Sequence, residues 1–296
     1  MNRRVVVTGL GVIAPNGIGK EEFWGAIKSG KSGITRITRF DPARLTSQCA
    51  GEVTGFDPAD YIEPKRLKRM DRTSHLAVSA AKMAVEDANL DFTKEDTDRI
   101  GVILGIAAGG YGYILEQHHT FLKKGPMRIN PFTVIASFSD SSSSQIAIEF
   151  NLGGPNFSVS SACSSGVDAL GYAFNAIRRD EIDLAVTGGA DAPLYPGVMA
   201  SFCVVRALST NNDEPDKASR PFDRKRDGFV LGEGAGILIL EELEHAKKRN
   251  AHIYAEILGY GITCDASHIT QPRPDGEAAA RAIHLALKDA NIAIYL

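Results

Sequence analysis

The 296-residue sequence lacks several features that mark particular classes of protein. Its four cysteines lie far apart without a C-x-x-C pair, which argues against a zinc site or a redox dithiol and favours a reducing, cytoplasmic compartment. No apolar run approaches the ~20 residues of a membrane-spanning helix. Charge is nearly balanced, with 33 Lys and Arg against 36 Asp and Glu, so nonspecific nucleic-acid binding has no support. The cysteines are Cys49, Cys163, Cys203 and Cys264.

The N-terminus resembles a secretion signal only superficially. Arg3 and Arg4 precede an apolar run over residues 5–14. Thr8 and two glycines interrupt that run, Pro15 closes it, and no small-residue cleavage site follows. We therefore expect a first β-strand here and no export signal.

Strand-like and helix-like segments alternate along the chain, which predicts a layered α/β fold. β-Branched runs predict strands, and apolar residues at spacings of three and four predict helices. The expected strands cover residues 5–8, 100–104, 157–159, 183–187, 236–242 and 254–258. The expected helices cover residues 21–28, 75–89, 145–150, 164–178 and 243–249.

The chain also repeats itself. A strand ends in Gly9-Leu10-Gly11, and a second strand ends in Gly259-Tyr260-Gly261. The segment AVEDANL at 84–90 has a counterpart, ALKDANI, at 286–292. These matches predict two similar halves: residues 1–250, and the start of a second half at residues 251–296.

The segment FSVSSACSSGVDALGYAFNAIRR carries the strongest chemical signal. It predicts a strand, a turn of small residues with Cys163, and then a helix with Ser160 or Ser161 as its cap. A thiol at a helix N-terminus meets the positive end of the helix dipole, which favours the thiolate, and nearby N–H groups can hold an oxyanion. The alternative is a buried, inert cysteine. The expected core stripe of the helix is Val167, Leu170, Phe174 and Ile177.

A nicotinamide-binding site is a competing interpretation. The run GLGVIA at 9–14 follows a strand and imitates G-x-G-x-x-A. That fingerprint requires a helix to begin at once, and Pro15-Asn16-Gly17 prevents it. We therefore do not expect a dinucleotide site.

Taken together, SSACSSG, VTGGADAP and RPFDRKRDGFVLGEGAG resemble the β-ketoacyl-acyl carrier protein synthases, especially the elongating enzyme of bacterial fatty-acid synthesis. The likeness runs in order from VVVTGLGVIAPNG to DASHIT. It implies a thiolase-like fold, five-layered α/β/α/β/α with duplicated halves, the second of them incomplete here. It also implies a homodimer that uses acyl carrier protein and its acyl and malonyl thioesters, with no metal or cofactor of its own, since the carrier protein carries the phosphopantetheine.

The resemblance also implies roles for single residues. Cys163 corresponds to the nucleophile that holds the acyl chain as a thioester, before malonyl-carrier protein loses carbon dioxide and its carbanion attacks. Ala108 corresponds to a residue lining the acyl pocket, and Phe202 and Arg206 lie beside the entrance. His268 and Thr270, in DASHIT, fall near the pantetheine tunnel, although an exposed loop histidine is the simpler interpretation of His268. The basic residues Lys65, Lys68 and Arg69 correspond to a carrier-protein patch, or form a solvated helix end.

The sequence departs from the family in one respect. The family's two decarboxylation histidines lie in an N-A-H-G-T motif and a later G-H motif, and neither motif occurs here. The incomplete second half would also leave apolar surface uncovered, so we expect either that the natural chain continues past Leu296 or that residues 1–296 are poorly stable alone. Two alternatives stay open: a truncated homologue that dimerises or binds carrier protein without condensing anything, and a polyketide ketosynthase.

Overall fold

One mixed β-sheet organises the molecule. The computed structural model describes residues 3–293. The strands run in the order β2-β1-β8-β7-β5-β6, and β9 pairs with β1. Strand β5 is parallel to β6 and β7, whereas β8 is antiparallel to β7 and β1. The strands are β1 (Val5–Ala14), β2 (Gly17–Ile18), β5 (Ile100–Gly105), β6 (Asn156–Val159), β7 (Leu184–Asp191), β8 (Gly234–Glu242) and β9 (Ala255–Ile257), with a separate pair β3 (Thr35–Arg36) and β4 (Cys49–Ala50).

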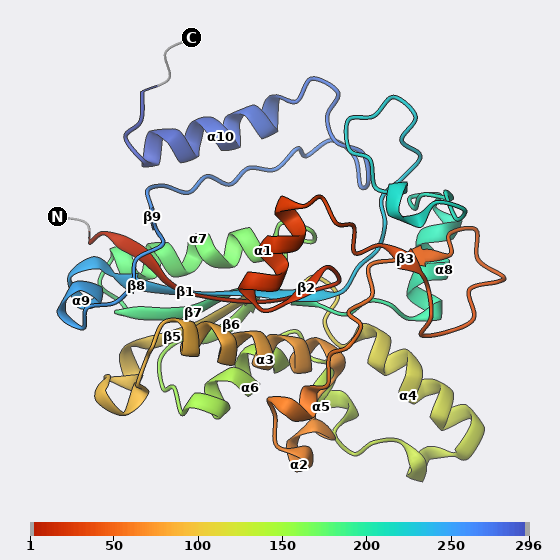
Figure 1. The fold of residues 1–296 in the computed structure, drawn as a ribbon, viewed down its shortest axis with the longest axis horizontal. Coiled ribbons are helices and arrows are strands. Elements are labelled where there is room, and N and C mark those ends of the chain that lie inside the picture. The colour runs from red at the N-terminus through yellow and green to blue at the C-terminus, as the bar shows by residue number, and fades with distance from the viewer. Residues whose placement is uncertain (1–2, 294–296) are drawn as a thin grey trace.

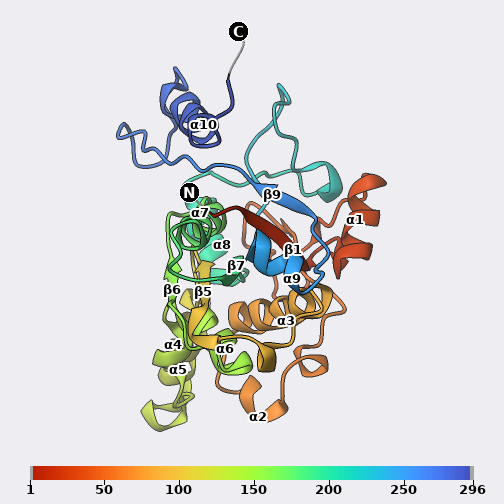
Figure 2. The same cartoon turned by 90° about the vertical axis from the view of Figure 1, so that its left-hand side faces the viewer.

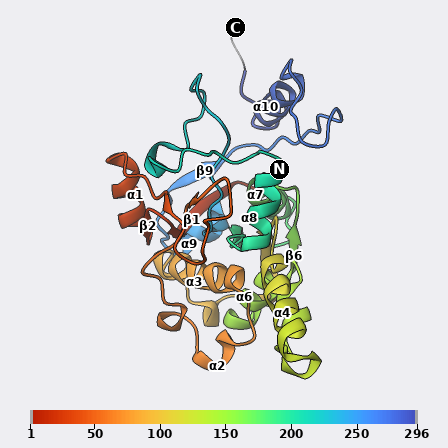
Figure 3. The same cartoon turned by 90° about the vertical axis from the view of Figure 1, so that its right-hand side faces the viewer.

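Helices cover both faces of this sheet (Figure 1). Helices α3 (Arg72–Asp87) and α6 (Ser141–Phe150) lie on one face, and α7 (Ser165–Arg178) and α1 (Lys20–Lys28) lie on the other. Helix α10 (Glu277–Asp289) lies beyond α7, on the side away from α3 (Figure 2). Helix α4 (Tyr111–Lys124) lies on the side that carries β6, away from α1 (Figure 3). The remaining helices are α2 (Pro64–Leu67), α5 (Thr133–Ser137), α8 (Pro196–Val204) and α9 (Leu243–Lys248).

The apolar core is divided by the sheet. Leu76, Ala80 and Ala84 of α3 pack on one face and are fully buried. Phe174 and Ile177 of α7 pack on the other, at 2% and 0% exposure. The Asp71 carboxylate caps α3 by accepting the N–H groups of residues 73 and 74, which satisfies donors that the helix itself leaves unpaired.

The sequence repeat is also a repeat of packing. Added Cβ atoms on Gly9 and Gly11 would lie within 2.3 Å of α3 backbone oxygens, and Cβ atoms on Gly259 and Gly261 would lie within 2.4 Å of α10 backbone oxygens. In each copy the N–H group between the two glycines donates to a carboxylate at the end of the helix. Leu10 donates to Asp87 at 2.9 Å, and Tyr260 donates to Asp289 at 3.1 Å. The same close strand–helix contact is therefore built twice.

Several sequence-based expectations need correction. Strand β1 extends beyond the expected residues 5–8 to Ala14, and a two-residue turn then leads directly into β2. The expectation that no helix begins at the GLGVIA run is confirmed. Gly188 and Gly189 lie inside β7 rather than after it. A Cβ on Gly188 would meet the Gly236 carbonyl oxygen at 2.0 Å, so glycine is required by the approach of β8.

Helices α4 and α8 were not predicted. The apolar side chains of α4 are largely exposed, and α8 is apolar on all sides, with Met199 buried and Val204 exposed, so neither sequence shows a clear stripe.

Candidate active site

Cys163 lies in a tight turn between β6 and α7. The residue is exposed and stands immediately before Ser164, the N-cap of α7, so the expectation of burial in the alternative interpretation is wrong. Ala162 adopts φ +57°, in the left-handed region that non-glycine residues rarely enter. The Ser165 hydroxyl holds this conformation, since it accepts the Ser161 N–H at 2.9 Å and donates to the Ala162 carbonyl at 2.6 Å. Backbone strain kept in place by neighbours is typical of functional turns.

A buried carboxylate on α7 ties this turn to the helix. Asp168 is 5% exposed, and it accepts hydrogen bonds from the hydroxyls of Ser161, Ser164 (3.3 Å) and Tyr260 (2.5 Å). The expected capping by Ser160 or Ser161 is therefore wrong, because the Ser161 hydroxyl donates to Asp168 and Ser164 occupies the cap. Burial and the bond to Asp168 raise the pKa of Tyr260, which keeps the phenol protonated as a donor.

Glycines let the strands approach the base of the turn. A Cβ on Gly105, at the end of β5, would lie 2.1 Å from the Ser165 backbone carbon. A Cβ on Gly189, in β7, would lie 3.1 Å from the Gly166 Cα. The start of α7 therefore packs directly against the backbone of two strands, at glycines that have no side chain between the strands and the turn that carries Cys163.

Two cavities meet at Cys163. The larger, about 830 Å³, is lined mainly by apolar side chains of α1, β1, β8 and α7. The smaller, about 270 Å³, lies toward Ala107 and Asp191. Val167 is 62% exposed and lines the larger cavity with Leu170, so the predicted core stripe is correct only for its second half, Phe174 and Ile177.

The predicted pocket residue Ala108 lies in the loop after β5. The residue is exposed, and its N–H group donates to Asp191 at 2.9 Å. Asp191 and the neighbouring Ala107 line the smaller cavity together with Cys163. Burial raises the pKa of Asp191, and the N–H groups of the loop oppose that rise.

The four predicted entrance residues lie further along the chain. Phe202 is half-buried on α8 and packs edge-on against Phe229, with ring centres 5.5 Å apart. Arg206 is exposed just after α8, with φ +55°. His268 is exposed, and its Nδ1 accepts the N–H of Thr270 at 3.1 Å, in keeping with a loop histidine. None of the four lines either described cavity at Cys163.

The predicted basic patch surrounds α2. Lys65, Lys68 and Arg69 are exposed, and within residues 3–293 none of them forms an ion pair. The Arg69 guanidinium stands 5.3 Å from the centre of the Phe132 ring. Arg66, between them, points elsewhere and pairs with Glu149. Three cations are thus left facing solvent on one short segment.

Sequence reasoning missed Asp168, Tyr260 and Asp191. A charged residue among the apolar residues of α7 was the available signal for Asp168. Nothing near Tyr260 in the sequence indicates a partner 92 residues away.

No group of three potential metal ligands occurs among the described residues, and none of the helices found there has the length and apolarity to cross a membrane.

Family models match nearly the whole chain. Residues 2–246 match the β-ketoacyl synthase N-terminal domain, and residues 254–295 match the β-ketoacyl synthase C-terminal domain. The chain is 43% identical to 3-oxoacyl-[acyl-carrier-protein] synthase 2 of Coxiella burnetii and 45% identical to that of Synechocystis. Each alignment covers 98% of this chain and 70% of the relative.

Solved structures agree with this assignment. The ishigamide ketosynthase/chain length factor superposes with a TM-score of 0.90 at 39% identity, covering 99% of this chain and 71% of that one. A β-ketoacyl synthase from Burkholderia phymatum superposes at 0.88 with 37% identity, covering 98% and 71%. A type II polyketide ketosynthase solved with its acyl-carrier protein, AntDE:AntF, also gives 0.88 at 37% identity, covering 99% and 71%. The predicted thiolase-like α/β fold is confirmed, and the chain belongs to the β-ketoacyl synthase family.

Proposed function

We propose that the chain is a 3-oxoacyl-acyl carrier protein synthase of fatty-acid elongation and that Cys163 is its nucleophile. The observation that carries this proposal is the exposed thiol at the start of α7, beside an apolar cavity of about 830 Å³. A cavity of this size suits an alkyl chain, and the small residues around the sulfur let a thioester approach.

The chemical step that these residues support is acyl transfer. The Cys163 thiolate attacks the thioester carbonyl of acyl-carrier protein and forms a new S–C bond. The carrier's phosphopantetheine thiolate leaves and takes up a proton. Backbone N–H groups at the start of α7 would stabilise the oxyanion between these events. The family then condenses this acyl group with decarboxylated malonyl-carrier protein, and the histidine motifs of that step do not occur in this sequence.

The carrier protein is the partner that we propose for the basic patch. Lys65, Lys68 and Arg69 present free positive charge, which favours an acidic partner and speeds its encounter. The solved neighbour AntDE:AntF is itself a ketosynthase complex with an acyl-carrier protein. Ala108, Phe202, Arg206, His268 and Thr270 stay proposals for the path of acyl chain and pantetheine. No cofactor of the chain's own is proposed.

We also propose a homodimer and a division of the chain near residue 250. Strand β6 lies at one edge of the sheet and has no partner on its outer side within residues 3–293, and Phe157 on it is 39% exposed. Nearby α4 and α5 present further apolar side chains, among them Tyr111 at 60% and Val134 at 63% exposure. An unpaired strand beside an apolar surface is suited to pairing with a second copy, and sedimentation equilibrium measures it.

The first prediction is that acyl-carrier protein loads one acyl group on Cys163, measured by intact mass and peptide mapping. Cys163→Ala is expected to abolish loading, because no other described cysteine shares the turn at α7. Cys264→Ala is the matched control, since Cys264 is also exposed. Failure of the wild-type chain to load would contradict the enzyme assignment and favour a binding-only homologue. Faster loading from polyketide starters than from fatty-acyl chains would favour a polyketide ketosynthase, the class of the solved neighbour AntDE:AntF.

A further inference from the structure

Asp191 holds a loop by an unusual set of contacts. Its carboxylate ends β7 and accepts three consecutive backbone N–H groups. The Ala107 N–H reaches Oδ2 at 2.8 Å, and those of Ala108 and Gly109 reach Oδ1 at 2.9 Å each. No Lys, Arg or His within residues 3–293 forms an ion pair with this carboxylate.

The loop has few other anchors. The Ile106 N–H continues the strand pattern to Val159, at 3.0 Å. Gly109 then turns through φ +54°, and its carbonyl accepts a long bond of 3.4 Å from Thr73. Between these two points every N–H of the loop donates to Asp191. The Ala108 carbonyl also accepts the Tyr111 N–H at 3.3 Å, but the Asp191 carboxylate is the acceptor of all three N–H groups of residues 107–109, so the path of these residues depends chiefly on this side chain.

The loop and the thiol share a cavity. Asp191, Ala107 and Cys163 all line the space of about 270 Å³ at the base of the turn. Gly105, directly before the loop, touches the start of α7. A shift of the loop would thus change the shape of the space beside the sulfur.

We propose that Asp191 is a positioning residue that determines acyl-chain specificity by clamping residues 107–109 beside Cys163. This proposal rests on the acyl transfer proposed above. The carboxylate has two acceptor oxygens for three donors. The isosteric Asp191→Asn keeps one oxygen and turns an NH2 group toward a backbone N–H, so at least one donor loses its acceptor.

The experiment uses the full chain as wild type, Asp191→Asn and Asp183→Asn. Asp183 stands directly before the other end of β7 and pairs with Arg3 and Arg99, which makes it the matched control. The first measurement is amide hydrogen exchange of residues 107–109. The second is the ratio of Cys163 alkylation rates by N-octylmaleimide and N-methylmaleimide, which needs no enzyme activity.

We expect Asp191→Asn to exchange these amides about tenfold faster and to change the maleimide ratio about threefold. Asp183→Asn should lower the melting temperature and leave both measurements at their wild-type values. Asp191→Glu keeps both oxygens one methylene further out. This variant should keep the amides of residues 107–109 protected from exchange but change the ratio of the two maleimide alkylation rates. It replaces Asp191→Asn in the experiment if that variant fails to fold.

Two results would overturn the role of Asp191. One is unchanged exchange in Asp191→Asn, and the other is faster exchange with an unchanged maleimide ratio in both Asp191 variants. Loading from acyl-carrier proteins of different chain length, measured in parallel, separates this inference from the proposed function. A wild type that never loads overturns the function. A wild type that loads, with the same chain-length profile in the Asp191 variants, overturns only the role of Asp191.

Discussion

At the scale of single residues, the site depends on a carboxylate whose partners are all hydroxyl groups. Asp168 is 5% exposed and accepts from Ser161, Ser164 and Tyr260 without a cation beside it among the described residues. Gly171, one turn along α7, leaves the space for the Tyr260 ring, because a Cβ there would lie 2.5 Å from ring atoms. The turn that presents Cys163 is thus held partly by a residue of the C-terminal segment.

Removing that phenol is expected to destabilise the protein. Tyr260→Phe leaves the buried Asp168 carboxylate short of one donor, which costs about 1.5–3 kcal/mol for a hydrogen bond to a charged group. The measurement is urea denaturation followed by circular dichroism. Tyr172→Phe is the matched control. Tyr172 lies on α7, as Asp168 does, is 48% exposed, and its hydroxyl has no hydrogen bond to the described residues. Equal effects of the two substitutions would contradict the role of the Asp168 contact.

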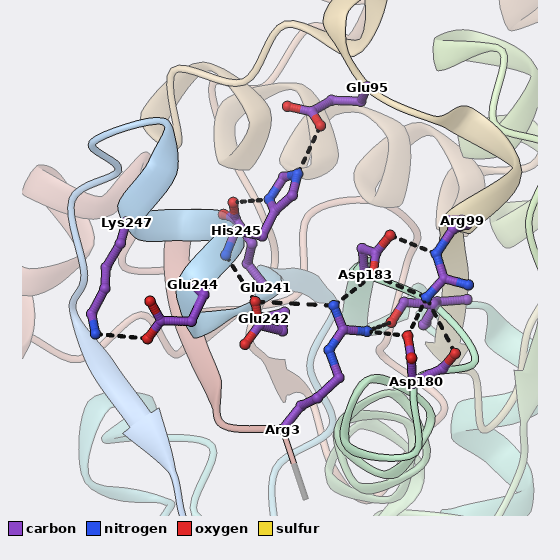
Figure 4. Close-up of polar contacts among 11 residues, drawn as sticks. Arg3, Glu95, Arg99, Asp180, Asp183, Glu241, Glu242, Glu244, His245 and Lys247 are labelled. Carbon is purple, nitrogen blue, oxygen red and sulfur yellow. Dashed lines mark hydrogen bonds and ion pairs between the residues drawn. The ribbon is translucent and has the colours of Figure 1, made fainter. Parts of the chain in front are cut away.

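At the scale of elements, β8 and α9 are joined by a charged network (Figure 4). Glu241 of β8 is fully buried and accepts hydrogen bonds from Thr8, from His245 at 2.6 Å and from Arg249 at 2.8 Å. The other ring nitrogen of His245 lies 2.9 Å from a carboxylate oxygen of Glu95. The bond to Glu241, with the charges of Glu241 and Glu95, raises the pKa of His245 against the effect of burial.

This network predicts a stability that depends on pH. A raised pKa means that protonated His245 favours the folded state. Its contribution is complete below about pH 6.5, the pKa of an unfolded histidine, and is lost as pH rises through the folded value. His245→Gln should therefore cost about 1 kcal/mol near pH 6 and much less near pH 9, a modest value because the side chain is 26% exposed.

Denaturation midpoints at both pH values measure this difference. Four groups face the ring directly or through the network: Glu95, Glu241, Glu242 and Arg249. His284→Gln on the exposed side of α10 is the control and should show no pH-dependent loss. A His245→Gln effect that grows toward pH 9 would show that the sign is wrong.

At the scale of the whole molecule, the two copies of the repeated strand–helix contact differ in how deeply their carboxylates are buried. Asp87 ends the buried helix α3, is 13% exposed, and also pairs with Lys20 and accepts from Tyr254 at 3.0 Å. Asp289 ends α10, its side chain is 28% exposed, and it pairs with Arg178 at 2.9 Å. The first contact joins α3 to β1, a strand of the main sheet, whereas residues 259–261 have no strand partner among the described residues.

The two carboxylates should therefore act on different cooperative units. Asp87→Asn is expected to lower the melting temperature of the whole molecule by several degrees. Asp289→Asn is expected to increase hydrogen exchange in residues 277–289 while the global melting temperature stays nearly constant, because partly exposed ion pairs contribute about 0–1 kcal/mol. A global loss of stability in Asp289→Asn as large as that in Asp87→Asn would mean that α10 folds together with the sheet.

The apolar surface over α7 belongs to the same scale. Val167 and Leu170 follow the helical spacing that predicts a core stripe, yet they border an open cavity. The chain spans about 70% of the length of the curated relatives that it matches. Periodicity reports which side of a helix is apolar, but it does not report whether another element covers that side.

The sequence by itself determined the local features. Strand and helix positions, the turn of small residues around Cys163, the internal repeat and the family all depend on neighbouring residues or on long motifs, so they could be predicted without a structure. Only the tertiary structure decided that Ser161 donates to Asp168 rather than capping α7, that Tyr260 completes that carboxylate, and that Asp191 holds residues 107–109. These contacts join residues far apart in the chain, and no local pattern records which distant donor a buried carboxylate will meet.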